Sequence, residues 1–212
     1  MRSSKIIVYT GVIIATIIWS LSFIWYKEIF EYLKPISTVF LRLIISTIFL
    51  AIISIFLRKL QKIERRHYKI FVLLTLFEPF LYFLGESVGL QYVSSSLGAI
   101  VISTIPLFMP FAAYYFLKER LSKWNFLGII ISLSGVLLVI FSGNHEVSGA
   151  VTGILIMLIA VVSAIFYNVI LIRLTKHYSV FTIITYQNGL GAIYFLPVFF
   201  IFEYNHFQQR SE

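Results

Sequence analysis

Apolar residues fill seven long stretches of this chain, and polar residues gather between them. Inside the stretches the apolar residues are continuous, as in Val12-Ile13-Ile14 followed by Ile17-Ile18. This favours helices over the alternating strands of a barrel. A helix needs about 20 apolar residues to cross the hydrocarbon of a bilayer. We therefore predict seven membrane-spanning helices over Ile6–Tyr26, Ile36–Leu57, Ile70–Leu90, Leu97–Leu117, Trp124–Phe141, Gly149–Ile172 and Val180–Phe202.

The composition supports the same interpretation. With 59% hydrophobic and 12% charged residues and a mean hydropathy of +0.93, the chain lacks the polar surface of a soluble domain of this size. The expected fold class is an all-α integral membrane protein in contact with the lipid bilayer. The chain has no cysteine, which excludes disulfides and thiolate chemistry.

Positive charge is distributed unevenly among the connections between the stretches. The imbalance places the amino terminus in the cytoplasm and, after seven crossings of the cell inner (plasma) membrane, the carboxyl end outside. It also explains the excess of 17 Lys and Arg over 9 acidic residues without a nucleic-acid partner. Alternate connections carry most of the basic residues, namely Arg2, Lys5, Arg58, Lys59, Lys62, Arg65, Arg66, Lys69, Lys118, Arg120, Lys123, Arg173 and Lys176.

The chain contains a weak internal repeat. Gly11–Tyr26 and Gly153–Asn168 each begin with glycine, continue through aliphatic residues and end in an aromatic cluster. A repeat that restarts at the sixth helix contains five helices, and an odd number inverts the second copy, as in many transporters. We expect a five-helix repeat over residues 1–141 and a partial second repeat, apparently truncated, over 149–212.

Several short motifs together indicate a family. The chain resembles the EamA-like family of the drug/metabolite transporter superfamily, which implies ten helices in two inverted repeats and the movement of small organic solutes, often outward. Since this chain holds seven predicted helices, an inactive fragment or a half-transporter that needs a homodimer or a complementing chain stays an alternative. The motifs are Pro106-Leu107-Phe108, Phe116-Leu117-Lys118-Glu119-Arg120-Leu121, Gly128, Gly135-Val136, Trp19-Ser20, Lys27, Pro35, Arg42, Gly89-Leu90-Gln91-Tyr92 and Ser94-Ser95-Ser96.

Three charged residues fall inside the predicted helices: Arg42, Glu78 and Glu86. An ionisable group in hydrocarbon costs about 3 kcal/mol or more, so such residues usually face a polar route. Glu78, Tyr82 and Glu86 follow at spacings of four and share one helix face. Low dielectric favours the neutral form of an unpaired carboxyl, so Glu78 could carry a proton or pair with a cationic substrate. The alternative is a neutral Glu78 that hydrogen-bonds a neighbouring helix for structure.

Arg42 lies at an estimated depth close to that of Glu86. An Arg42–Glu86 ion pair would reduce the cost of burying both charges. The alternative is an Arg42 side chain that extends to the headgroups. Pro79, Pro106 and Pro110 should kink the third and fourth helices, either to line a binding site or as tolerated packing features.

Aromatic and amide groups could line a solute cavity. The candidates are Trp19 in the first helix and Gln187 and Asn188 in the last, although most aromatic residues here should pack or anchor at the interface. We find no nucleophile motif, metal-ligand spacing or phosphate loop, so we expect no enzyme activity, no cofactor and no metal. A seven-helix receptor is disfavoured by the cytoplasmic amino terminus. The best prediction is a proton-coupled or other secondary transporter, an exporter of metabolites, amino acids or drug-like compounds.

Overall fold

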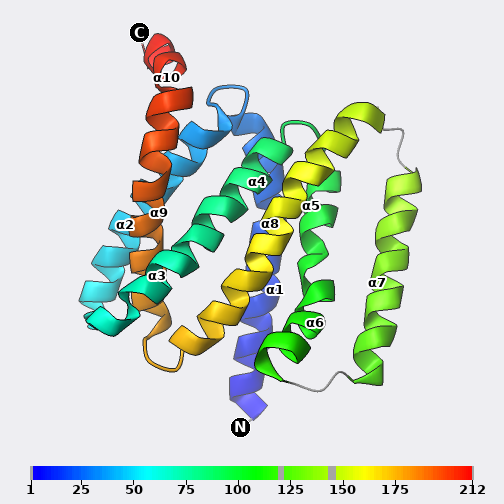
Figure 1. Cartoon of the computed structure of the whole chain (residues 1–212), viewed down its shortest axis with the longest axis horizontal. Coiled ribbons are helices and arrows are strands. Elements are labelled where there is room, and N and C mark those ends of the chain that lie inside the picture. Colours follow the sequence, from blue (N-terminus) through cyan, green and yellow to red (C-terminus); the bar gives the residue numbers. More distant parts are fainter. Residues whose placement is uncertain (1, 119–121, 143–146, 212) are drawn as a thin grey trace.

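A computed structural model describes residues 2–118, 122–142 and 147–211. Over these residues the chain forms helices and no strand, and the helices run up and down between two ends of the molecule (Figure 1). The first residues lie at one end and the last at the other. The elements are α1 (Arg2–Ile29), α2 (Pro35–Phe56), η1 (Arg65–His67), α3 (Tyr68–Thr75), η2 (Leu76–Leu81), α4 (Tyr82–Gly89), α5 (Ser95–Ser103), α6 (Ile105–Leu117), α7 (Lys123–Ser142), α8 (Val147–Leu174), α9 (Val180–Phe202) and α10 (Tyr204–Ser211).

Six helical stretches of the described residues are long and apolar enough to cross a membrane. They correspond to six of the predicted spans. The remaining predicted span, Trp124–Phe141, is helical as α7 but is not among the six, so the count of seven stays a prediction. The six stretches are Tyr9–Ile29, Pro35–Phe56, Arg65–Gly89, Ser95–Phe116, Val151–Leu174 and Val180–Phe202.

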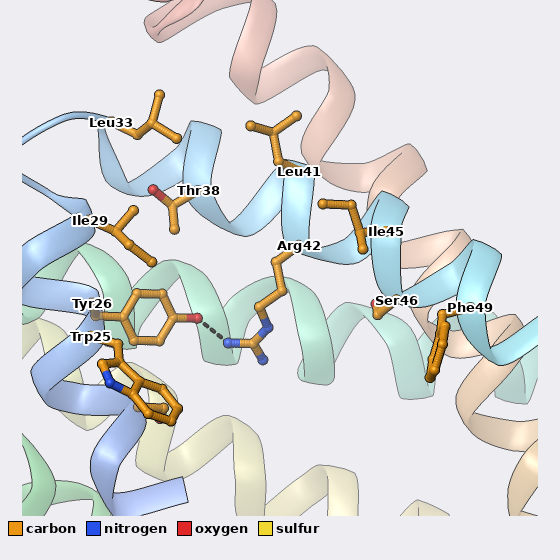
Figure 2. A pocket seen from close by; sticks show the side chains of 11 residues that line it. Trp25, Tyr26, Ile29, Leu33, Thr38, Leu41, Arg42, Ile45, Ser46 and Phe49 are labelled. Carbon is orange, nitrogen blue, oxygen red and sulfur yellow. Dashed lines mark hydrogen bonds between the residues drawn. The ribbon is translucent and has the colours of Figure 1, made fainter. Parts of the chain in front are cut away.

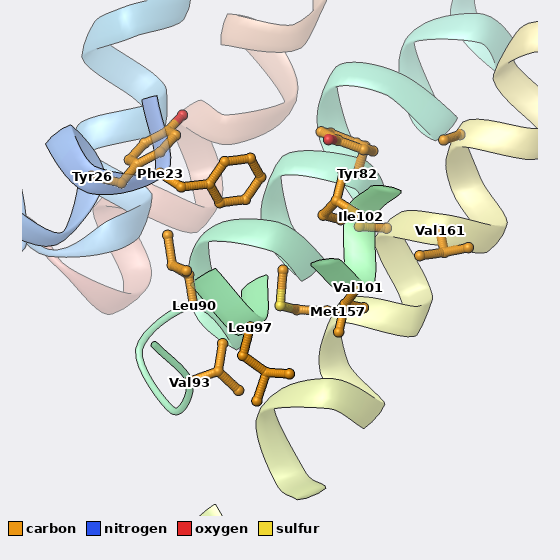
Figure 3. Packing of buried hydrophobic residues seen from close by; sticks show 12 residues of the cluster. Phe23, Tyr26, Tyr82, Leu90, Val93, Leu97, Val101, Ile102, Met157 and Val161 are labelled. Atoms are coloured by element: carbon orange, nitrogen blue, oxygen red, sulfur yellow. The ribbon is translucent and has the colours of Figure 1, made fainter. Parts of the chain in front are cut away.

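Glycines allow α4 and α8 to pack closely. A Cβ added to Gly85 would lie 2.9 Å from the backbone nitrogen of Ala160, and one added to Gly153 would lie 2.9 Å from the carbonyl oxygen of Gly89. Small residues bring helix backbones together in membranes, where packing replaces the hydrophobic drive. The contact continues into a buried cluster that joins α1, α4, α5 and α8 around Met157 and Phe23 (Figure 3).

α2 and α9 form the other extensive helix pair, and polar contacts tie it at several levels. Near one end, Ser54 and Thr185 share a hydrogen bond of 3.0 Å. At the opposite end, the buried carboxylate of Glu203 accepts from the backbone N–H and the hydroxyl of Ser37, both at 2.7 Å. Between them, the rings of Phe40 and Phe199 stack with centroids 4.9 Å apart.

Two of the predicted spans are interrupted next to a proline. The third span is interrupted at Glu78, whose φ of −143° and ψ of 123° are extended, and the peptide bond to Pro79 is cis. The fourth span divides at Thr104, and α6 begins just before Pro106. Pro110 lies inside α6, which continues through it.

Candidate functional site

A cavity of about 690 Å³ lies between α1 and α2 (Figure 2). Arg42 reaches into it from α2, and Tyr26 and Trp25 border it from α1. Most of the remaining wall is apolar. Such a combination of an apolar wall with a few polar groups is typical of sites for small organic molecules. The other lining residues are Ser22, Ile29, Leu33, Thr38, Leu41, Ile45, Ser46 and Phe49.

The guanidinium of Arg42 interacts with aromatic side chains. Arg42 donates a hydrogen bond to the hydroxyl of Tyr26. Its Cζ atom lies 4.0 Å from the centroid of the Phe83 ring. A delocalised guanidinium stacks on aromatic faces more readily than an ammonium does. These contacts hold the Arg42 side chain against α1 and α4.

The predicted Arg42–Glu86 ion pair does not form at contact distance. Among the described residues, the ion pair that the structure shows joins Arg66 and Glu64 at 2.6 Å. Glu86 instead accepts a hydrogen bond of 2.9 Å from the hydroxyl of Tyr82. Arg42 and Glu86 are nonetheless close enough to interact electrostatically. The prediction failed because Tyr26 and Phe83 occupy the space beside the guanidinium.

Glu86 and Tyr82 lie on one face of α4, as their spacing predicts. Both are buried, at 2% and 5% exposure. Glu78 precedes them at the break of the third span and is half-buried. It interacts electrostatically with Glu86 and Arg42. The structure thus brings together the three charged residues that the sequence places inside the apolar layer.

The polar groups continue beyond Glu78 toward the other end of the helices. Tyr167 of α8 interacts electrostatically with Glu78. Its hydroxyl donates a hydrogen bond of 3.2 Å to Oε1 of Gln187. The starts of α2 and α9 lie at opposite ends of the molecule. Arg42 is roughly 10 Å from the start of α2, and Gln187 is roughly 10 Å from the start of α9. We call the residues Tyr26, Arg42, Glu86, Tyr82, Glu78, Tyr167 and Gln187 the polar line.

Two predicted site residues lie outside the polar line. Trp19 is 42% exposed, touches Phe23 with its ring edge and does not border the cavity between α1 and α2. Asn188 follows Gln187 on α9 and is half-buried. Trp25 lines the cavity instead of Trp19. Trp25 and Ile29 are spaced by four and share one face of α1, which borders the cavity.

Glu203 is a buried charged residue that the sequence does not predict. It lies just after the last apolar stretch, where charged residues are expected and do not indicate a specific role. The structure shows it 5% exposed and bound to the start of α2, where it also accepts from the N–H of Ile36 at 3.2 Å. A carboxylate at a helix amino terminus satisfies free N–H groups and interacts favourably with the helix dipole.

The described residues include no group of three or more His, Cys, Asp or Glu side chains that could hold a metal ion.

Part of one motif that suggests a family, Glu119-Arg120-Leu121, lies outside the described residues. The neighbouring Lys118 ends α6 in the left-handed conformation, with a φ of 60°.

Comparison with known proteins places these features in context. The family model of the EamA-like transporter family matches residues 6–141. The chain is 26% identical over 197 residues to the uncharacterized transporter YoaV of Bacillus subtilis (strain 168), an alignment that covers 92% of this chain and 68% of YoaV. It is 28% identical over 179 residues to an uncharacterized transporter of Archaeoglobus fulgidus, covering 84% of this chain and 62% of that protein. No solved structure matches.

Proposed function

We propose, from the premise that this chain belongs to the EamA-like transporter family, that it is a secondary transporter of small organic solutes or metabolites. The chain is a multi-pass membrane protein with six apolar helical stretches of spanning length among its described residues. Relatives that carry the word transporter in their names support the general activity. Amino acids and drug-like compounds are the substrate classes that we consider first.

The observation that carries the proposal is the polar line. It extends from Arg42, roughly 10 Å inside one end of the helices, to Gln187, roughly 10 Å inside the other end, through helices whose other residues are largely apolar. Buried polar and charged groups inside a membrane are costly and usually mark a substrate or ion route. The break at Glu78 lies between the two ends of this route, where interrupted helices place binding groups in many transporters.

We further propose that the chain crosses the cell inner (plasma) membrane seven times, with its amino terminus in the cytoplasm. Residues 1–141 would form one repeat and residues 149–212 part of an inverted second repeat. α1 and α8 support this proposal because they carry comparable sequences and occupy the first position of each repeat. Alternating access would then expose the polar line first to one side and then to the other, with export as the favoured direction.

The test is transport by the purified full chain in proteoliposomes. A panel of radiolabelled amino acids and organic cations is offered under an imposed pH gradient, and accumulation is compared with protein-free vesicles. We expect at least one compound to accumulate and Arg42→Gln to reduce that accumulation about tenfold or more, since a group on the route loses its charge. Lys59→Gln, which removes a cation at the molecule's basic end, serves as the matched control.

Two results would count against this proposal. Arg42→Gln transport equal to that of the unchanged chain would remove the polar line from the route. No accumulation of any compound, in a preparation that is folded by circular dichroism, would favour a second candidate.

The second candidate is a half-transporter that works with a second copy or a complementing chain. The specific observation in its favour is the exposed apolar rim of the cavity between α1 and α2, where Ile45 is 65% and Phe49 64% exposed. The chain also spans only part of the length of its relatives, 68% for YoaV and 62% for the Archaeoglobus protein. Mass measurement of the protein in detergent distinguishes one copy from two.

A further inference from the structure

A second cavity, of about 430 Å³, lies between α3, α9 and the connection that follows α2. It is at the end of the molecule where the basic connections gather, the lower end in Figure 1. None of its lining residues belongs to the polar line. The residues used below are Lys62, Tyr68, Phe71, Val72, Tyr186 and Leu190.

Polar and apolar groups are sorted along this cavity. Lys62 lies in the connection and Tyr68 begins α3, so both are at the level where the helices end. Leu190 is ten residues past the start of α9, roughly 15 Å deeper. Fifteen ångströms is about half of the hydrocarbon thickness of a bilayer. The cavity therefore has a polar mouth at the interface and an apolar wall that reaches through about one leaflet.

The mouth carries a lysine, Lys62, that has no ion-pair partner among the described residues. The carboxylate of Glu64 pairs with Arg66, 2.6 Å away, and the described residues place no carboxylate within ion-pair distance of Lys62. Tyr68 is 50% exposed beside it. Basic pockets between membrane helices at this level suit anionic lipid headgroups.

The apolar wall is already formed. Phe71 is 1% exposed, and its ring packs edge-to-face with the rings of Tyr178 and Tyr186, with centroid distances of 5.5 and 6.3 Å. The hydroxyl of Tyr194 donates a hydrogen bond of 3.2 Å to the carbonyl oxygen of Val72, which ties α9 to α3 beside the cavity. A chain of methylene groups can therefore enter without rearrangement of the helices.

We propose that this cavity binds one anionic phospholipid from the leaflet at the basic end of the molecule. The phosphate lies on the ammonium of Lys62 and accepts from the hydroxyl of Tyr68. One acyl chain follows Val72 and Leu190. This lipid site is independent of the transport activity, so its test needs no substrate.

The experiment is native mass spectrometry of the purified full chain after titration with phosphatidylglycerol or phosphatidylcholine. We expect one phosphatidylglycerol per chain to survive at lipid concentrations that leave phosphatidylcholine unbound. Lys62→Gln should weaken phosphatidylglycerol binding about fivefold, the equivalent of one lysine near an anionic surface. Lys69→Gln is the matched control, because Lys69 is exposed at the same end but does not line the cavity.

A second variant tests the apolar wall. Val72→Trp places an indole in the cavity from a residue that is 47% exposed and outside the buried clusters, and it should reduce phosphatidylglycerol binding while the melting temperature stays unchanged. Glycerol phosphate, which offers the headgroup without acyl chains, should not compete. Equal losses from Lys62→Gln and Lys69→Gln, equal binding of the two lipids, or competition by glycerol phosphate would each overturn the proposal.

Discussion

Glu203 shows how much one side chain can contribute to the contact between two helices. It lies one residue past α9, and its two oxygens accept from the N–H groups of Ile36 and Ser37 and from the Ser37 hydroxyl. The start of α2 has no capping side chain of its own, because Lys34 precedes it. A group more than 160 residues away in the chain therefore supplies the cap.

Removal of this cap should lower the stability of the protein. Glu203→Ala leaves buried N–H groups without a partner, and we expect the free energy of unfolding to fall by about 1–3 kcal/mol. Glu203→Gln keeps one oxygen acceptor and should lose less. Thermal unfolding in detergent, followed by tryptophan fluorescence, measures the change. Glu28→Ala, which removes an exposed carboxylate near the end of α1, is the control, and an equal loss there would contradict the role of Glu203 as a cap.

Glu78 offers a second prediction for a single residue. If it carries the coupling proton, Glu78→Gln should abolish accumulation driven by a pH gradient but leave exchange of labelled for unlabelled solute intact, because exchange needs no net proton movement. Both rates are measured in proteoliposomes. Glu64→Gln removes a carboxylate that pairs with Arg66 at the basic end, and it should change neither rate. Gradient-driven accumulation by Glu78→Gln at the level of the unchanged chain would exclude the coupling role.

Single residues also mark the limit of inference from the sequence. The spacing of Glu78, Tyr82 and Glu86 predicts a shared helix face, since that depends only on helix geometry. The partner of Arg42 was predicted incorrectly, because equal depth leaves the direction of a side chain undetermined. The role of Glu203 could not be predicted, since its contacts join distant parts of the chain.

Among the elements, α4 and α8 depend on glycine for their close contact. In Gly89→Ala the new methyl group would lie 2.9 Å from the carbonyl oxygen of Gly153 and would also meet Met157. We expect a loss of about 1–3 kcal/mol in the free energy of unfolding, as in other overpacked sites. Gly11→Ala in α1 is the matched control, because nothing lies within 4 Å of the position that its new methyl group would take. It should be neutral or stabilise α1 by about 0.5–1 kcal/mol.

The same unfolding measurement decides between two explanations of these glycines. A loss for Gly89→Ala in the monomer supports packing inside one chain. An unchanged melting temperature together with a lower molecular mass in detergent would instead assign Gly89 to contact between copies.

The positions of most elements follow from the sequence because the membrane sets their length. The prediction of Val180–Phe202 agrees with α9, and Ile36–Leu57 differs from α2 by one residue at each end. Pro79 and Pro106 mark the places where the third and fourth spans are interrupted. The short α10 was not predicted, since its polar residues lie outside the apolar layer and no periodic pattern distinguishes them.

At the scale of the molecule, orientation in the membrane can be tested directly, because the chain has no cysteine of its own. Tyr92→Cys places a thiol at an exposed site beyond α4, and Ser122→Cys places one at the opposite, basic end. With the amino terminus in the cytoplasm, a membrane-impermeant maleimide should label Tyr92→Cys in intact cells and Ser122→Cys only after permeabilisation. The reverse pattern would invert the proposed orientation.

The arrangement of the helices relative to one another was less predictable than the helices themselves. Apolar length identifies a span but does not say which neighbour it contacts, since every face of such a helix is apolar. Gly85 and Gly89 form the face of α4 that packs closely, and the partner of this face, α8, is evident only from the structure. The cavity between α1 and α2 likewise depends on the separation of two helices whose own sequences give no sign of it.

The ties between α2 and α9 limit how the protein can move. Glu203 joins them at one end, and Ser54 with Thr185 joins them near the other. Because contacts at both ends of a helix pair prevent the two helices from separating, α2 and α9 should move together as one rigid body. Any opening toward either side of the membrane then has to occur outside the contact between α2 and α9.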